Sequence, residues 1–239
     1  MIISTKAIVL RKIKYSDSSL IVDVFTELEG RKSFFLKGIL GKTKSKLKNS
    51  YFEPLSQILI KYNKREKKKI NFLLECKINI HCQSLYFDYR KSSIILFLNE
   101  ILNMCIIEEA CNKNLFLYLE SSLKWLDNNH KISNFHIVFI LNLLKYLGVN
   151  PQLKSANSKF LSFENGSFED EKPKGLCAEG QSVKSIISLL GMKFDNCFLL
   201  KVSQVQKHEI LKILLEYIEY HVQGFKKPKS LNILHQVFE

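Results

Sequence analysis

The 239-residue sequence has no long hydrophobic run of the kind that marks an export signal or a membrane span. Its first apolar stretch, Ala7–Leu10, is too short for the apolar part of a signal peptide. Its most apolar helical stretch, residues 94–107, is interrupted by Asn99 and Glu100 and falls short of the roughly 20 residues that a span requires. We therefore expect a cytoplasmic protein with no membrane partner.

Paired cysteines are also missing. The six cysteines form no C-x-x-C pair and have no disulfide-dense spacing, so we expect free thiols in a reducing compartment. Cys76, His81 and Cys82 lie close together in the sequence, but no second pair completes a tetrahedral metal site. The sequence therefore predicts buried cysteines and no metal ligation.

Motifs for catalysis are equally scarce. Residues 41–43 read Gly-Lys-Thr like the end of a phosphate-binding loop, but Leu36 stands where that loop requires its first glycine. The sequence has no G-x-S-x-G motif and no cysteine in a recognisable catalytic context. We expect a protein that is not an enzyme.

Acidic residues are few relative to basic ones, and the excess of basic residues is distributed unevenly along the chain. The chain has 36 Lys and Arg against 23 Asp and Glu, a net charge of +13. Residues 1–75 have 17 basic and 7 acidic residues, a net of +10, whereas residues 76–239 have 19 and 16, a net of +3. A lysine-rich codon bias would not remove acids from one third of the chain. This asymmetry predicts that the first third binds a polyanion such as nucleic acid.

Five short runs with strand-like alternation precede residue 80. They are Ser4–Lys12, Ser19–Thr26, Lys32–Gly38, Tyr51–Tyr62 and Ile70–Cys76. Pro54 lies near the start of the fourth run, where an edge strand tolerates proline. Five strands without a long helix between them predict a small closed or nearly closed barrel.

The apolar period changes to 3.6 residues from about Ser84 onwards, which predicts helices. The expected helices lie around residues 86–104, 115–126, 135–146, 183–190, 210–221 and 230–238. Residues 150–180 break the pattern and predict a long loop or a short hairpin. The overall fold class is α+β multidomain, with a β domain at 1–80 and an all-α domain at 81–239 with that long loop inserted.

Basic residues of the first domain are the candidate nucleic-acid contacts. They are Arg11, Lys12, Lys14, Arg31, Lys32, Lys37, Lys42, Lys44, Lys46 and Lys48. A solvated loop is the alternative for the alternating lysines at 42–48, and we favour it for the second run, residues 64–69. Phe34, Phe35 and Tyr51 offer rings for base stacking, although most aromatic side chains of so small a barrel lie in its core.

Several segments match, in order and spacing, those of a known family. Ser4–Leu10 and Tyr15–Val24 are similar to its first two barrel strands, and Tyr51–Leu55 to the approach to its fourth. Phe139–Pro151 is similar to its helix that ends in Leu-Gly-x-x-Pro, and Tyr217–Leu234 to its terminal signature. Over nearly its whole length the chain resembles the RecO family of bacterial recombination mediators.

This resemblance implies an oligonucleotide-binding (OB) fold barrel that binds single- and double-stranded DNA and anneals complementary strands. It also implies partnership with RecR and with the C-terminal tail of the single-stranded-DNA-binding protein (SSB), and thereby loading of RecA, in the bacterial cytoplasm and at the nucleoid. Candidate partner contacts are Lys226, Lys227, Lys229 and Leu231, for which packing of the C-terminal helix is the alternative explanation. Many members have a four-cysteine zinc module, but residues 157–175 contain no cysteine, so we expect no cofactor.

Two other functions remain open from the residues alone. An RNA-binding OB-fold protein associated with translation would use the same electrostatics. A DNA-processing enzyme would require a convergent carboxylate or metal site, which the sequence does not indicate.

Overall fold

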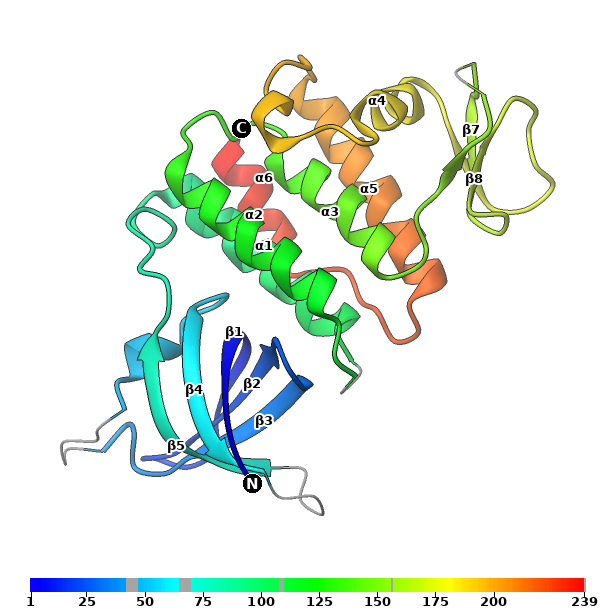
Figure 1. The fold of residues 1–239 in the computed structure, drawn as a ribbon. Helices are drawn as coiled ribbons and strands as arrows, with labels where there is room; N and C mark the ends of the chain where they lie inside the picture. The colour runs from blue at the N-terminus through cyan, green and yellow to red at the C-terminus, as the bar shows by residue number, and fades with distance from the viewer. Residues whose placement is uncertain (42–46, 65–69, 108–109, 156, 239) are drawn as a thin grey trace. The chain divides into compact units, whose positions relative to one another are not determined.

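The computed structural model describes residues 1–41, 47–64, 70–107, 110–155 and 157–238 (Figure 1). The chain forms two compact units, Met1–Asp127 and Asn128–Glu239. The first unit contains the barrel together with two helices, so this division lies further along the chain than the expected domain boundary at 80/81. That boundary stays a prediction.

The N-terminal part of the first unit forms a closed five-stranded barrel with strand order β1-β2-β3-β5-β4 (Figure 1). The strands are β1 Ile2–Lys14, β2 Leu20–Thr26, β3 Gly30–Leu36, β4 Gln57–Asn63 and β5 Ile70–Ile78. β1 pairs antiparallel with both β2 and β4, and the parallel pairing of β3 with β5 closes the ring. The predicted five-stranded barrel is confirmed.

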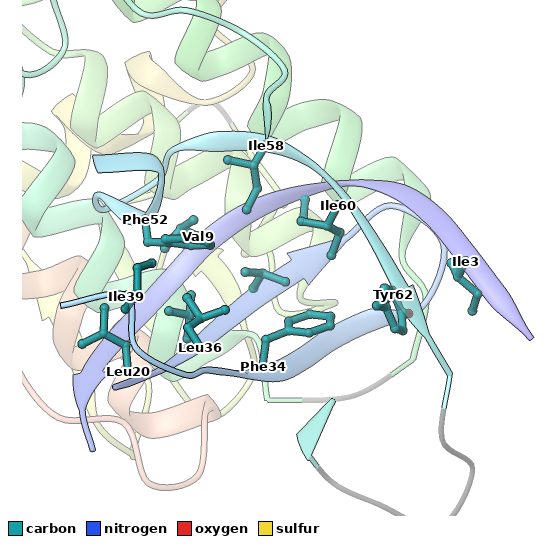
Figure 2. Close-up of a cluster of buried hydrophobic side chains, with 13 residues drawn as sticks. Ile3, Val9, Leu20, Phe34, Leu36, Ile39, Phe52, Ile58, Ile60 and Tyr62 are labelled. Atoms are coloured by element: carbon teal, nitrogen blue, oxygen red, sulfur yellow. The ribbon is translucent and has the colours of Figure 1, made fainter. Parts of the chain in front are cut away.

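Alternate residues of each strand fill the barrel interior, as a half-buried strand requires. Val9, Phe34, Ile60 and Tyr62 are among the buried side chains that converge there (Figure 2). The rings of Phe34 and Tyr62 meet edge-to-face with their centroids 5.0 Å apart. Because Phe34 belongs to the core, it offers no stacking surface to a ligand.

The fourth strand begins later than the sequence predicted. Residues Asn49–Phe52 form a 3-10 turn, and the strand starts only at Gln57. Between them Leu55 has a φ of 58°, in the left-handed region that a strand cannot contain. Complete burial of the Leu55 side chain and a 2.9 Å hydrogen bond from its N–H to the carbonyl of Val9 offset that strain. Pro54 therefore lies in a turn and not in an edge strand.

Two helices cover part of the outer surface of the barrel. They are α1, Tyr89–Cys105, and α2, Lys113–Asn128. Phe25 of β2 packs against Phe116 of α2 with ring centroids 6.0 Å apart, and Lys6 of β1 forms an ion pair with Glu120 at 3.0 Å. These contacts cover the outer side of β1 and β2 near the middle of β1.

A polar network at Asp127 holds the chain between the barrel and α1. The carboxylate accepts hydrogen bonds from the backbone N–H groups of Gln83, Ser84 and Leu85, at 2.7–3.1 Å. The fully buried Lys91 ammonium donates to the Asp127 carbonyl at 2.7 Å. Burial alone would raise the pKa of the Asp127 carboxyl, but the backbone hydrogen bonds outweigh it and hold the pKa below its ordinary value of 3.8.

Helices dominate the second unit. They are α3 Phe135–Tyr146, α4 Gln181–Leu189, α5 Gln204–His221 and α6 Leu231–Phe238, close to the ranges that the sequence predicted. α5 begins with a capping box between Ser203 and Gln206. Among the described residues, no helix is long and apolar enough to cross a membrane.

Residues 150–180, for which the sequence predicted a long loop or a short hairpin, form a small sheet that includes an antiparallel hairpin, so the region from 81 onwards is mostly helical and not all-α. β6 Gln152–Leu153, β7 Phe160–Ser162, β8 Ser167–Glu169 and β9 Cys177–Glu179 pair in the order β6-β8-β7-β9. The sheet is stabilised by packing of apolar side chains from this segment against α5. Phe163 meets Tyr217 of α5 edge-to-face at 5.5 Å.

We predict that replacing Asp127 with Ala lowers the free energy of unfolding by about 2 kcal/mol, because three N–H groups, two of them partly buried, lose their charged acceptor. The carboxylate stabilises the fold above its unfolded-state pKa of about 4, and this contribution is lost as the pH falls through the depressed folded-state value. Urea unfolding at neutral and acidic pH measures both effects. Asp17→Ala is the control, because Asp17 is exposed, and equal stability of the two variants would contradict the assignment.

Candidate nucleic-acid interface

Two turns meet at one end of the barrel and bring exposed lysines with them. The turn after β1 approaches the turn after β3, where the N–H of Leu40 donates to the carbonyl of Ser18 at 3.0 Å. Lys14 precedes the first turn and Lys37 begins the second, and both side chains are exposed. Lys14 forms a surface ion pair with Asp17 at 3.2 Å, which contributes little to stability and is readily exchanged for another anion.

Arg11 and Lys12 lie on β1 just beyond the part of the strand that pairs with β4. They line a cavity of about 330 Å³ between β1, the segment Phe52–Pro54 and α1. Lys12 forms an ion pair with Glu53 at 2.9 Å, whereas the Arg11 side chain is exposed. Of this pair, Arg11 is the better placed to meet a phosphate.

Arg31 has a different environment from the other candidates. Its guanidinium donates to the carbonyls of Asn103 and Ile106 at the end of α1, at 2.7 and 2.8 Å, and also to the Asn103 side chain. It also forms an ion pair with Asp23 at 2.8 Å, with both side chains largely buried. Because these contacts use both terminal nitrogens, Arg31 joins the barrel to α1, and we leave it out of the surface proposed below.

Lys32 lies near an acid at the opposite end of β3. Burial would raise the pKa of Glu29, but hydrogen bonds from Lys64 and Tyr62 and the charge of Lys32 lower it below its ordinary value. Glu29 therefore stays ionised and partly compensates the charge of Lys32. This end of the barrel is less favourable for a polyanion than the end with Lys14 and Lys37.

The lysine-rich loop is described only in part. Lys42, Lys44 and Lys46 lie outside the described residues, whereas Lys48 is exposed at the start of the 3-10 turn. The second basic run lies between β4 and β5, which are antiparallel neighbours. Its residues 65–69 also lie outside the described part of the chain.

Three aromatic side chains contact one another on the outside of the barrel, and the sequence predicted only one of them. Phe35, a predicted stacking candidate, meets Tyr15 edge-to-face at 5.4 Å and Phe72 edge-to-face at 5.8 Å. Phe72 was not predicted, because only the pairing of β3 with β5 brings residues 35 and 72 together, and Tyr15 in the turn after β1 was not predicted either. Tyr51, the remaining candidate, is half-buried against the barrel core.

Cys76 and Cys105 are half-buried cysteines with the chemistry of apolar groups, whereas Cys111 is exposed. Burial raises the pKa of the Cys76 and Cys105 thiols to about 12, so both stay protonated at neutral pH. The described residues contain no cluster of three or more His, Cys, Asp or Glu that could hold a metal ion. With Cys177 the lone cysteine of the small sheet, the residues present do not fit a four-cysteine zinc site.

The candidate partner contacts of the second unit lie between α5 and α6. Lys226, Lys227 and Lys229 are exposed, and Lys227 forms an ion pair with Glu216 at 3.3 Å. Leu231 is half-buried at the start of α6. These three lysines therefore form a basic turn directly before α6.

Two family models match the chain over nearly its whole length. The model of the Recombination protein O N-terminal region matches residues 1–80, and that of its C-terminal region matches residues 86–231. The chain belongs to the RecO family. RecO proteins are non-catalytic recombination mediators, so this chain is a DNA repair and recombination protein and not an enzyme, as the sequence predicted.

Full-length relatives agree with this assignment. The DNA repair protein RecO of Christiangramia forsetii is 39% identical over 238 residues, and that of Flavobacterium psychrophilum is 38% identical over 238 residues. The DNA repair protein RecO of Phocaeicola vulgatus is 33% identical over 241 residues. In all three cases the match covers 100% of both chains, so the barrel and the helical region both belong to the shared RecO architecture.

We predict that Arg31→Ala lowers the free energy of unfolding by about 3 kcal/mol, because it leaves Asp23 without its ion-pair partner and two carbonyls of α1 without a donor. Lys37→Ala is the matched control, because that side chain is exposed, and we expect a change within about 0.5 kcal/mol. Denaturant unfolding of both variants measures the difference. Equal stability would show that the Arg31 contacts contribute nothing.

Proposed function

We propose that this RecO protein binds single- and double-stranded DNA mainly through its barrel and anneals complementary strands. The observation that supports the proposal is the concentration of charge, since residues 1–75 have a net charge of +10 out of +13. The relatives named above are DNA repair proteins, so we take DNA and not RNA as the ligand. The proposed phosphate contacts are Arg11, Lys12, Lys14, Lys32, Lys37 and Lys48, with Lys42, Lys44 and Lys46 of the loop.

Charge neutralisation is the proposed mechanism of annealing. Two DNA strands repel each other through their phosphates, and a basic surface that binds one strand lowers the repulsion felt by the second. The exposed Lys14 and Lys37 at one end of the barrel, with Arg11 on the adjacent part of β1, suit this role because their side chains reach solvent. Contacts of this kind read the backbone, so binding tolerates differences in sequence.

The partners are proposed on the basis of the family. We propose that the protein acts with RecR and binds the acidic, apolar C-terminal tail of SSB, so that RecA is loaded on SSB-coated DNA in the cytoplasm. The exposed Lys226, Lys227 and Lys229 would pair with acidic groups of the tail, and Leu231 would contact its apolar end. Titration of the full chain with a tail peptide tests this, and unchanged affinity after replacing the three lysines with Ala would refute it.

We predict that the affinity for a single-stranded oligonucleotide falls steeply with salt, because binding releases the counterions that phosphates hold. Replacing Arg11, Lys14 and Lys37 together with Ala should reduce the slope of log affinity against log salt by about 2. Fluorescence anisotropy across a salt series measures the slope. A slope near zero for the wild type would refute the proposed DNA binding, and an unchanged slope for the variant would remove these three residues from the surface.

Strand annealing tests the activity itself. Two complementary oligonucleotides coated with SSB should pair faster when the wild-type protein is added, and the triple variant should accelerate pairing less. Competition with an RNA oligonucleotide of the same sequence separates DNA from RNA binding. Tighter binding of RNA would favour the translation-associated alternative.

A further inference from the structure

A row of apolar side chains crosses four strands on the outside of the barrel. Ile13 of β1 pairs with Ile21 of β2, which pairs with Phe35 of β3, which pairs with Phe72 of β5. Paired residues point to the same side of a sheet. Their chain neighbours Val22 and Phe34 are buried in the core, so the row faces outward.

This row is not covered by the helices of its own compact unit. The α1 and α2 contacts involve Lys6, Phe25 and Arg31, which are nearer the other end of the same outer surface. Beyond them Ile13, Ile21 and Phe35 are half-buried, and Phe72 is 44% exposed. Tyr15, which meets Phe35 edge-to-face, is 66% exposed. A soluble barrel that leaves aromatic rings in water along one row presents a binding surface.

The apolar surface continues along β5. Ile70 and Leu74 are exposed on either side of Phe72. Leu74 also lines a cavity of about 470 Å³, together with the ion pair of Lys61 and Glu75 and with Lys77. The surface therefore combines aromatic rings, an apolar hollow and cationic side chains at its edge.

The charges around the row favour an anionic partner. The acids nearby already have basic partners: Asp23 pairs with Arg31, Asp17 with Lys14 and Glu75 with Lys61. Arg11 precedes Ile13 by two residues and lies on the same outer surface of β1. Lys37 follows Phe35 by two residues. The side chains of Arg11 and Lys37 are exposed. An apolar peptide would gain nothing from this rim, whereas a nucleic acid would pair its phosphates with the cations and its bases with the rings.

We propose that Tyr15, Phe35 and Phe72 form a platform on which the unpaired bases of single-stranded DNA stack. This inference rests on the proposed DNA binding and adds a division of labour to it. The basic groups bind the phosphates of either single or double strands, and the platform binds only bases that are not already stacked in a duplex. Tyr15 and Phe72 make the direct contacts, and Phe35 holds both rings in place through its edge-to-face contacts.

The test compares two ligands of equal charge. Oligothymidylate and an abasic oligonucleotide of the same length present the same phosphates, but only the first has bases to stack. Tyr15→Ala combined with Phe72→Ala should weaken binding of the full chain to oligothymidylate by about 10- to 100-fold. Binding to the abasic strand and to a duplex should stay unchanged. Phe87→Ala is the matched control, because Phe87 is an 85% exposed aromatic residue away from the row.

A second variant reports stacking directly and keeps an aromatic ring in place. Trp125 is the single tryptophan of the chain, so Phe72→Trp in a Trp125→Phe background places the only indole on the platform. Oligothymidylate should quench its fluorescence, whereas the abasic strand should not.

The outcomes separate the two proposals. If the wild type binds oligothymidylate in a salt-dependent way but the double variant binds it equally well, the platform is refuted and the basic surface stands. Equal losses on both ligands would also refute stacking, because they would show an effect on charge or folding. A wild type that binds neither ligand would overturn both proposals.

Discussion

Closure of the barrel is the constraint on which the rest of the first unit depends. β1 is 13 residues long and pairs with both β2 and β4, so the ring closes and its inner surface becomes the core. A closed barrel has no free sheet edges, and every outward residue is either covered by another element or left to meet solvent and ligands. α1 and α2 cover one part of that outer surface through Phe25, Lys6 and Arg31.

Charged and aromatic side chains lie close together on the part of the barrel surface that α1 and α2 do not cover. Lys14 and Lys37 lie beside two turns that the barrel brings together. The register of the strands places Phe35 next to Phe72. The same scaffold therefore positions groups for phosphates and groups for bases side by side. Under the proposed function, this arrangement binds single strands without reading their sequence, which annealing of any complementary pair requires.

Local patterns predicted most of the elements, because alternation and 3.6-residue spacing depend on nearby residues alone. The features that the sequence did not predict depend on contacts between residues that are distant in the sequence. Leu55 is forced into a left-handed conformation by its burial in the fold, which no local pattern indicates. In the sequence Arg31 does not differ from its basic neighbours. Only the fold brings its guanidinium to the carbonyls at the end of α1. The platform required the parallel pairing of β3 with β5, and the small sheet at 152–179 required the packing of Phe163 on α5.

The central claim is that the uncovered outer surface of the barrel is the principal DNA-binding surface. Amide hydrogen exchange of the full chain, with and without a single-stranded oligonucleotide, tests this most directly because it follows both units of the chain in one experiment. The account predicts slower exchange on binding in the turn after β1, in the turn after β3 and along β5, with little change in α3 to α6. Protection confined to residues 128–238 would contradict it.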